Sequence, residues 1–132
     1  MVTRGRDRYL CRAPIPIVAS PARPMRVWMR ADGTLPDDPL LHVCLLTYAS
    51  DMTLLGSVLA RHDVSMANVQ MASLDHAMWF HRPFRADEWL LYTCYSPSAT
   101  GSRGLATGRF TTRDGTLVAM AVQEGLVRLP QK

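Results

Sequence analysis

Residues 38–56 have the sequence DPLLHVCLLTYASDMTLLG, and this stretch determines the fold class that we predict for the chain. Asp38 suits the N-cap of a helix, and Pro39 suits the first helical position, where its missing N–H would have no intrahelical partner. The residues that follow are apolar on nearly all sides, which is typical of a buried helix. We therefore predict a buried helix over Leu40–Leu55, ended by Gly56.

The segments on either side of this helix predict an antiparallel sheet. Residues 25–30 alternate between apolar and polar side chains and indicate a short strand, while a second helical turn is expected over 57–61. The Asp114-Gly115 pair is typical of a tight hairpin. One helix with antiparallel strands makes an α+β domain, in which a curved sheet wraps around the helix. The later strands that we expect are Val69–His81, Glu88–Tyr95, Ser102–Thr111 and Thr116–Arg128, with a loop over 96–101.

The positive charge is concentrated at the start of the chain. The formal net charge is +4, but residues 1–30 hold seven arginines and one aspartate, so that segment carries +6 and the remainder carries −2. Residues 1–24 also hold four of the nine prolines, so we interpret them as a basic Pro-rich arm and 25–132 as a single domain. The domain lacks a basic patch with aromatic residues for stacking, so we expect it to bind no nucleic acid; binding through the basic arm is a third, weaker interpretation.

The apolar segments and the cysteines favour a cytoplasmic protein. No run of about 18 apolar residues is present, so we expect no membrane span. The apolar stretch over 13–18 is short and interrupted by prolines, which makes a poor signal peptide. Three widely spaced cysteines indicate reduced thiols, and they argue against a disulfide framework or a zinc site.

Three polar residues lie where the patterns predict apolar surroundings. Asp51 falls within the apolar helix, where a carboxylate is costly unless it is paired; it is either a general base or a helix-end carboxylate that reaches water. Gln123 shares a strand face with small apolar residues, which favours a buried hydrogen-bonding role beside a ligand or a satisfied core amide. Ser73, which is weak evidence by itself, would share a strand face with Met71, Ala77 and Trp79.

The other polar residues do not form a catalytic pattern by spacing. His76 is three residues from Ser73, so on a regular strand the two would face opposite sides and form no Ser–His dyad. His76 and His81 also differ in parity, which argues against a shared metal, and we interpret both as structural. Arg82 and Arg103 are candidates for phosphate binding, although solvated arginines are more common. No G-x-S-x-G turn is present to expose a nucleophile.

The chain contains a specific series of motifs, which are LTYASD (46–51), SLDHAMWFHRPF (73–84), EWLLY (88–92), RG (103–104), DGTLVA (114–119) and VQEG (122–125). Their order and spacing resemble the acyl-CoA thioesterase II (TesB-like) family through most of residues 25–128. The run DHAMWFHRPF is the most specific of these motifs.

The resemblance implies a hotdog fold and hydrolysis of fatty acyl-CoA to a free fatty acid and coenzyme A, with no metal or other cofactor. By position, Asp51, Ser73 and Gln123 match the family's catalytic aspartate, hydroxyl residue and glutamine; threonine is common at the place of Ser73. Asp51 would take a proton from a water molecule that Ser73 and Gln123 hold in line with the thioester carbonyl. Backbone N–H groups, for example at a helix end, would stabilise the oxyanion.

One departure from the family pattern leaves a second interpretation open. Members usually carry two hotdog units in one chain, and this chain resembles the second unit without the first. Because hotdog sites resemble clefts between two units, we expect a homodimer or higher homo-oligomer, or a separate partner subunit. The alternative is a non-catalytic hotdog module that binds acyl-CoA or pairs with another hotdog subunit. In either case the unpaired unit should expose apolar surface.

Overall fold

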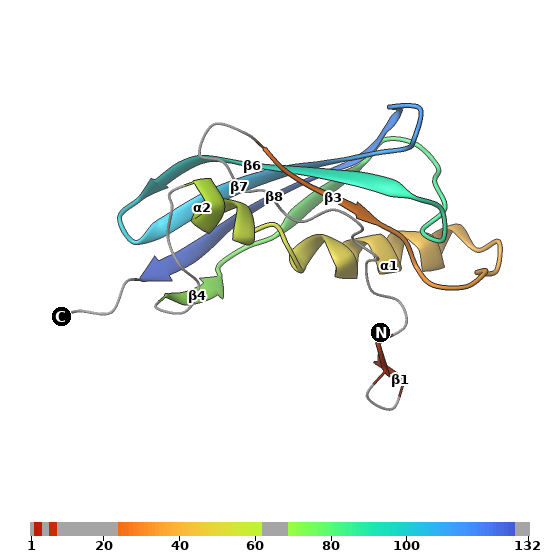
Figure 1. Ribbon diagram of the computed structural model, residues 1–132, viewed down its shortest axis with the longest axis horizontal. Coiled ribbons are helices and arrows are strands. Elements are labelled where there is room, and N and C mark those ends of the chain that lie inside the picture. Colours follow the sequence, from red (N-terminus) through yellow and green to blue (C-terminus); the bar gives the residue numbers. More distant parts are fainter. Residues whose placement is uncertain (1, 4–5, 8–23, 62–68, 129–132) are drawn as a thin grey trace.

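A single antiparallel sheet of six strands dominates the structure, a computed structural model that describes residues 2–3, 6–7, 24–61 and 69–128 (Figure 1). The strands follow the order β3-β6-β7-β8-β4, and β5 also pairs with β8. A separate two-stranded sheet pairs β1 (Val2–Thr3) with β2 (Arg6–Asp7). The strands of the main sheet are β3 (Met25–Met29), β4 (Gln70–Ser73), β5 (Ala77–Phe80), β6 (Leu90–Thr100), β7 (Arg103–Thr111) and β8 (Leu117–Arg128).

The helical segment begins where the sequence predicts and ends earlier. Asp38 is the N-cap of α1 (Pro39–Asp51), and its carboxylate accepts a hydrogen bond from the backbone N–H of Leu40 at 3.0 Å. The helix stops at Asp51, so the predicted end at Leu55 is wrong. Gly56 does not end that helix but begins α2 (Gly56–Arg61). The turn between the helices lets both Leu54 and Leu55 enter the core.

The helix α1 lies along one face of the curved sheet (Figure 1). Only one side of this helix is buried. Its buried residues are His42, Leu46 and Ser50, one in each turn. On the other side Leu40 is 69% exposed and Tyr48 is 57% exposed. The prediction of a helix buried all round is therefore wrong for the single chain, because the sheet covers only one face of α1.

The helical segment Pro39–Arg61 is long and apolar enough to cross a membrane by length and composition. In this structure, however, it is divided into α1 and α2, and Leu46, Leu54 and Val58 from it join the hydrophobic core beneath the sheet. This packing is that of the core helix of a globular domain, for which apolar composition is equally expected.

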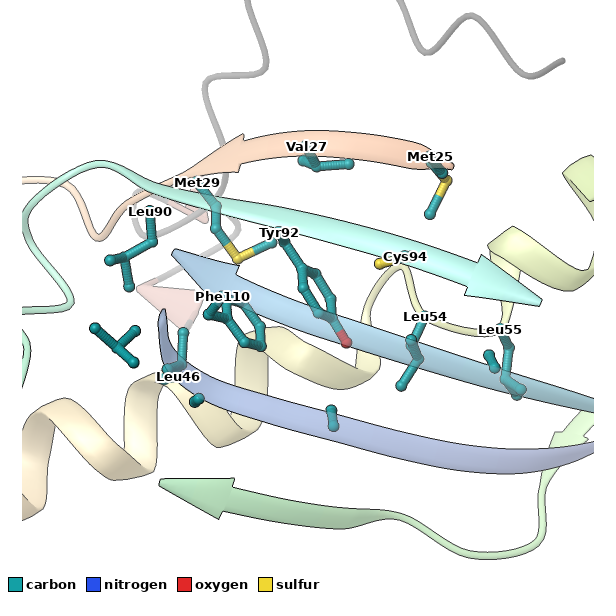
Figure 2. Close-up of a cluster of buried hydrophobic side chains, with 14 of the residues drawn as sticks. Met25, Val27, Met29, Leu46, Leu54, Leu55, Leu90, Tyr92, Cys94 and Phe110 are labelled. Carbon is teal, nitrogen blue, oxygen red and sulfur yellow. The ribbon is translucent and has the colours of Figure 1, made fainter. Parts of the chain in front are cut away.

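The core lies between the sheet and the helices and is centred on a stacked aromatic pair (Figure 2). The rings of Tyr92 on β6 and Phe110 on β7 are fully buried, with centroids 3.8 Å apart. Gly108 leaves room for Tyr92, since a Cβ there would lie 2.3 Å from the ring. The Tyr92 hydroxyl donates to the backbone carbonyl of Ser50 at 3.1 Å, which ties the sheet to the last turn of α1. Burial raises the pKa of Tyr92 far above its usual value, so the hydroxyl stays a neutral donor.

Two facing glycines allow the second helix to approach the sheet. Gly104 on β7 and Gly125 on β8 are cross-strand partners, and side chains of the helical segment lie over both. A Cβ on Gly104 would lie 2.3 Å from Val58 Cγ1, and one on Gly125 would lie 2.7 Å from the Leu55 methyl groups. The absence of side chains at this pair therefore sets how closely α2 packs.

Gly104→Ala is expected to destabilise the fold by about 1–3 kcal/mol, because the added methyl group overfills the contact with Val58. Chemical denaturation measures this change in the free energy of unfolding. Gly56→Ala is the control: a Cβ at Gly56 meets nothing within 4 Å, so that variant should unfold at the same denaturant concentration as the wild type or slightly above it. Equal stability of both variants would contradict the packing described for Gly104.

The predicted strand Val69–His81 is in fact two strands. Ser73 pairs with Gly125 and Ala77 pairs with Val122, so β4 and β5 are separated by one residue more than the facing stretch of β8. The Asp75 carboxylate accepts a hydrogen bond from the Glu124 N–H at 2.7 Å and stabilises this break. An extra residue reverses the inward and outward positions beyond it.

This reversal changes which residues of β5 face the core. Met78 packs against the core, whereas Trp79 is 51% exposed. The prediction that Ser73 shares a face with Ala77 and Trp79 is therefore wrong.

The hairpin between β6 and β7 also differs from the prediction. The strand β6 continues to Thr100, so the loop expected over 96–101 is wrong. The chain turns at Gly101 and Ser102, which have φ of +58° and +57°. The hairpin at Asp114-Gly115 is confirmed, with Gly115 at φ +88° and a hydrogen bond from Thr112 N to Thr116 O. The expected curved antiparallel sheet around one long helix is confirmed, whereas most of the predicted arm, residues 8–23, lies outside the described residues.

Candidate functional site

The three residues singled out by the sequence meet at the end of α1. Asp51 is the last residue of α1, Ser73 is the last residue of β4, and Gln123 lies within β8. Gln123 Nε2 donates to Asp51 Oδ1 at 2.6 Å and to Ser73 Oγ at 2.7 Å. Ser73 Oγ lies 3.5 Å from Asp51 Oδ1, at the outer limit of a hydrogen bond. Side chains separated by 22, 50 and 72 positions in the chain thus form one polar cluster.

Sheet register explains how these side chains converge. Ser73 pairs with Gly125, two residues beyond Gln123 on the same face of β8, so both side chains point towards α1. Gln123 is fully buried, and its neighbours on the same face of β8 are the small residues Ala121 and Gly125. Gln123 is thus buried and hydrogen-bonded, as both of the roles that the sequence allows for it require.

The orientation of the Gln123 amide follows from its neighbours. The atom that faces Asp51 at 2.6 Å must be the nitrogen, because an amide oxygen there would oppose a carboxylate oxygen. Both N–H hydrogens are then used, on Asp51 and on Ser73. The other amide atom, Oε1, is buried without a hydrogen-bond partner among the described residues. Gln123 therefore binds both Asp51 and Ser73 through its two N–H hydrogens, and the expectation that it also holds a water molecule stays a prediction.

Asp51 is open to solvent although it lies beside a buried amide. Its side chain is 60% exposed, so water can hydrate the carboxylate. The negative end of the α1 dipole also lies here and does not stabilise an anion. The C-terminal end of α1 therefore presents carbonyl groups and offers no N–H donors to an oxyanion. Within the described part of the chain, the contacts of Asp51 with Ser73, Gln123 and His76 all involve Oδ1.

His76 is a neighbour of this cluster that the spacing argument missed. Its Nε2 lies 2.7 Å from Ser50 Oγ, and its Nδ1 lies 3.8 Å from Asp51 Oδ1. His76 and Ser73 would face opposite sides of a regular strand, but both border Asp51 because the strand is interrupted between β4 and β5. The sequence feature that indicates this position of His76 is the Asp75-His76 pair, because Asp75 stabilises the interruption between β4 and β5.

The remaining candidates lie outside the cluster. His81 is exposed in the segment after β5, and Arg82 Nη1 donates to the carbonyl of Leu117 at 2.8 Å. Arg103 Nε lies 3.7 Å from the Glu124 carboxylate. Among the described residues, no hydrogen bond or ion pair joins any of these three to Asp51, Ser73 or Gln123.

A cavity of about 690 Å³ lies at the other end of α1. His42, Phe80, Arg82 and Phe84 are among the residues that line it, but Asp51 and Gln123 are not. The polar cluster is therefore not at the bottom of this cavity. In the single chain the carboxylate of the cluster faces an open surface.

The chain is similar in sequence to the members of one family. The family described as acyl-CoA thioesterase matches residues 20–126. Acyl-coenzyme A thioesterase 8 of Mus musculus is 50% identical over 103 residues, which is 77% of this chain and 32% of that protein. Acyl-CoA thioesterase 2 of Haemophilus influenzae is 38% identical over 106 residues, 79% of this chain and 37% of that protein.

A solved structure agrees with these sequence relatives. The acyl-CoA thioesterase II TesB2 from Mycobacterium marinum superposes with a TM-score of 0.78 at 53% identity, covering 89% of this chain and 45% of that one. The chain thus spans about a third of the length of the curated relatives, and less than half of the mycobacterial chain. The chain therefore resembles one part of each of these longer proteins.

Proposed function

The chain belongs to the acyl-CoA thioesterase family, and we propose that it hydrolyses acyl-CoA to a free fatty acid and coenzyme A. The observation that carries this proposal is the meeting of Asp51, Ser73 and Gln123 in one hydrogen-bonded cluster. A solvated carboxylate held by neutral donors suits a general base that acts on water.

In the proposed reaction, Asp51 takes a proton from a water molecule as the water oxygen attacks the thioester carbonyl carbon. Gln123 holds Oδ1 of Asp51, so Oδ2 is the oxygen that we assign to the water. Ser73 accepts from Gln123, and its own hydrogen is available to the water or to Asp51. The tetrahedral intermediate then collapses, the C–S bond breaks, and coenzyme A leaves as a thiolate that takes up the proton.

We propose that a second hotdog unit, most simply another copy of this chain, completes the site. Two features support this assembly: the apolar outer face of α1, and β5, for which the described residues provide a partner on one edge only. Exposed apolar surface rimmed by polar groups is typical of an interface. The second unit would cover Asp51 and contribute the oxyanion donors that α1 lacks.

We further propose that this protein acts in the cytoplasm without binding nucleic acid. Cys44 and Cys94 are free thiols, as a reducing compartment would keep them, and burial raises the pKa of Cys94 to about 12, so that thiol is inert.

Thiol release from acyl-CoA esters tests the proposed function. The purified chain should release coenzyme A from at least one ester in a series that runs from short to long acyl groups, and a thiol reagent measures the rate. A second tube without protein gives the background hydrolysis. A folded protein that releases no thiol from any ester would contradict the proposal and favour a module that binds acyl-CoA without cleaving it.

A further inference from the structure

His76 makes two contacts with the last turn of α1, one through each ring nitrogen. Nε2 lies 2.7 Å from the hydroxyl oxygen of Ser50. Nδ1 is buried and has no hydrogen-bond partner among the described residues, and it lies 3.8 Å from Asp51 Oδ1. A shift of less than 1 Å by the exposed Asp51 side chain would bring the two atoms within hydrogen-bond reach.

The Ser50 hydroxyl has one hydrogen and two strong acceptors. Its oxygen lies 2.7 Å from the carbonyl of Thr47 and 2.7 Å from His76 Nε2, while the weaker acceptor Met78 Sδ lies at 3.2 Å. If Ser50 donates to Thr47, a neutral His76 carries its hydrogen on Nε2, and the Nδ1 lone pair faces a carboxylate. If Ser50 donates to His76, the ring carries its hydrogen on Nδ1, directed at Asp51.

Electrostatics favours the second arrangement. A hydrogen bond to a carboxylate is about twice as strong as one between neutral groups, whereas two facing acceptors repel each other. Thr47 lies within α1, so its carbonyl can accept an intrahelical hydrogen bond even when the Ser50 hydroxyl donates to His76 instead. The carboxylate therefore selects the tautomer of the ring.

From these contacts we propose that His76 is a positioning residue, whose Nδ1–H is aimed at Asp51 Oδ1 and is oriented by a hydrogen bond from Ser50 to Nε2. Together with Gln123, His76 prevents rotation of the carboxylate, so that Oδ2 stays directed at the attacking water. The effect on the rate rests on the proposed thioesterase function, but the tautomer does not.

Imidazole ¹⁵N NMR on the full chain tests the tautomer directly. The ring of His76 should carry its hydrogen on Nδ1 at a pH where it is neutral, and the Nε2–H form should gain population in Asp51→Asn and in Ser50→Ala. An Nε2–H ring in the wild type, or a tautomer ratio unchanged by both variants, would overturn the proposal. This result does not depend on thiol release, so it separates failure of the inference from failure of the proposed function.

Two amide replacements test the effect on catalysis. Asparagine places its amide nitrogen where histidine has Nδ1, whereas glutamine places it near Nε2. His76→Asn should keep kcat close to that of the wild type, and His76→Gln should lower kcat by about 10- to 100-fold at unchanged KM. His81→Asn, at an exposed histidine outside the cluster, is the control and should have no effect. Equal losses in the two His76 variants, in proportion to lost stability, would show a merely structural residue and would overturn the proposal.

Discussion

Replacement of Asp51 by asparagine is expected to lower kcat for acyl-CoA hydrolysis by about 10²- to 10⁴-fold, because the amide cannot take a proton from water. Asparagine has nearly the shape of aspartate, and its side-chain oxygen can still accept the hydrogen bond from Gln123 Nε2. The side chain is exposed, so the substitution leaves no buried charge or cavity behind. Thiol release measured beside thermal unfolding separates the loss of chemistry from a loss of structure.

The control for this variant is Asp32→Asn, which removes the same charge from an exposed residue outside the site. Its rate should equal that of the wild type. If Asp51→Asn retained full activity in a folded protein, the carboxylate would be only a solvated helix end, the other interpretation that the sequence allows for this residue. The cluster with Ser73 and Gln123 would then be structural.

The features of the fold that depend on single residues or on composition are predictable from the sequence. The Asp38-Pro39 pair marks the start of α1, and Asp114-Gly115 marks a hairpin, because each relies on local backbone chemistry. Asp51 and Gln123 can also be identified, since a polar group in an apolar pattern needs a partner. The family resemblance then predicts that both residues lie close to Ser73. The periodicity of the sequence does not predict this.

The features that the sequence does not predict depend on tertiary contacts. The extra residue between β4 and β5 does not disturb the alternation of apolar residues in the sequence. Only the pairing of both strands with β8 shows that this residue is extra. The extra residue is the reason that two predictions were wrong: the strand face of Trp79, and the separation of His76 from Ser73. The apolar outer face of α1 has a different cause, because composition shows that a face will be covered but not which chain covers it.

That outer face gives the second large expected effect. Leu40→Glu combined with Tyr48→Glu should dissociate the proposed assembly, because both residues lie on the exposed side of α1, two helical turns apart. Each apolar side chain of this size contributes about 1.5–3 kcal/mol when it is buried, so losing two should weaken association by at least about 100-fold. Sedimentation velocity over a range of protein concentrations measures the change.

In this variant the loss of activity should match the loss of assembly. This concentration dependence distinguishes a lost interface from damage to the cluster of Asp51, Ser73 and Gln123. A site completed by a second copy loses its specific activity as the protein is diluted, and the glutamate variant should need a much higher concentration to recover the same rate. Thr100→Glu, at an exposed residue near the β6–β7 turn, should change neither association nor rate. A glutamate variant that assembles and works like the wild type would place the second unit on another surface. A wild type that is active as a monomer would mean that Asp51, Ser73 and Gln123 act without a second unit.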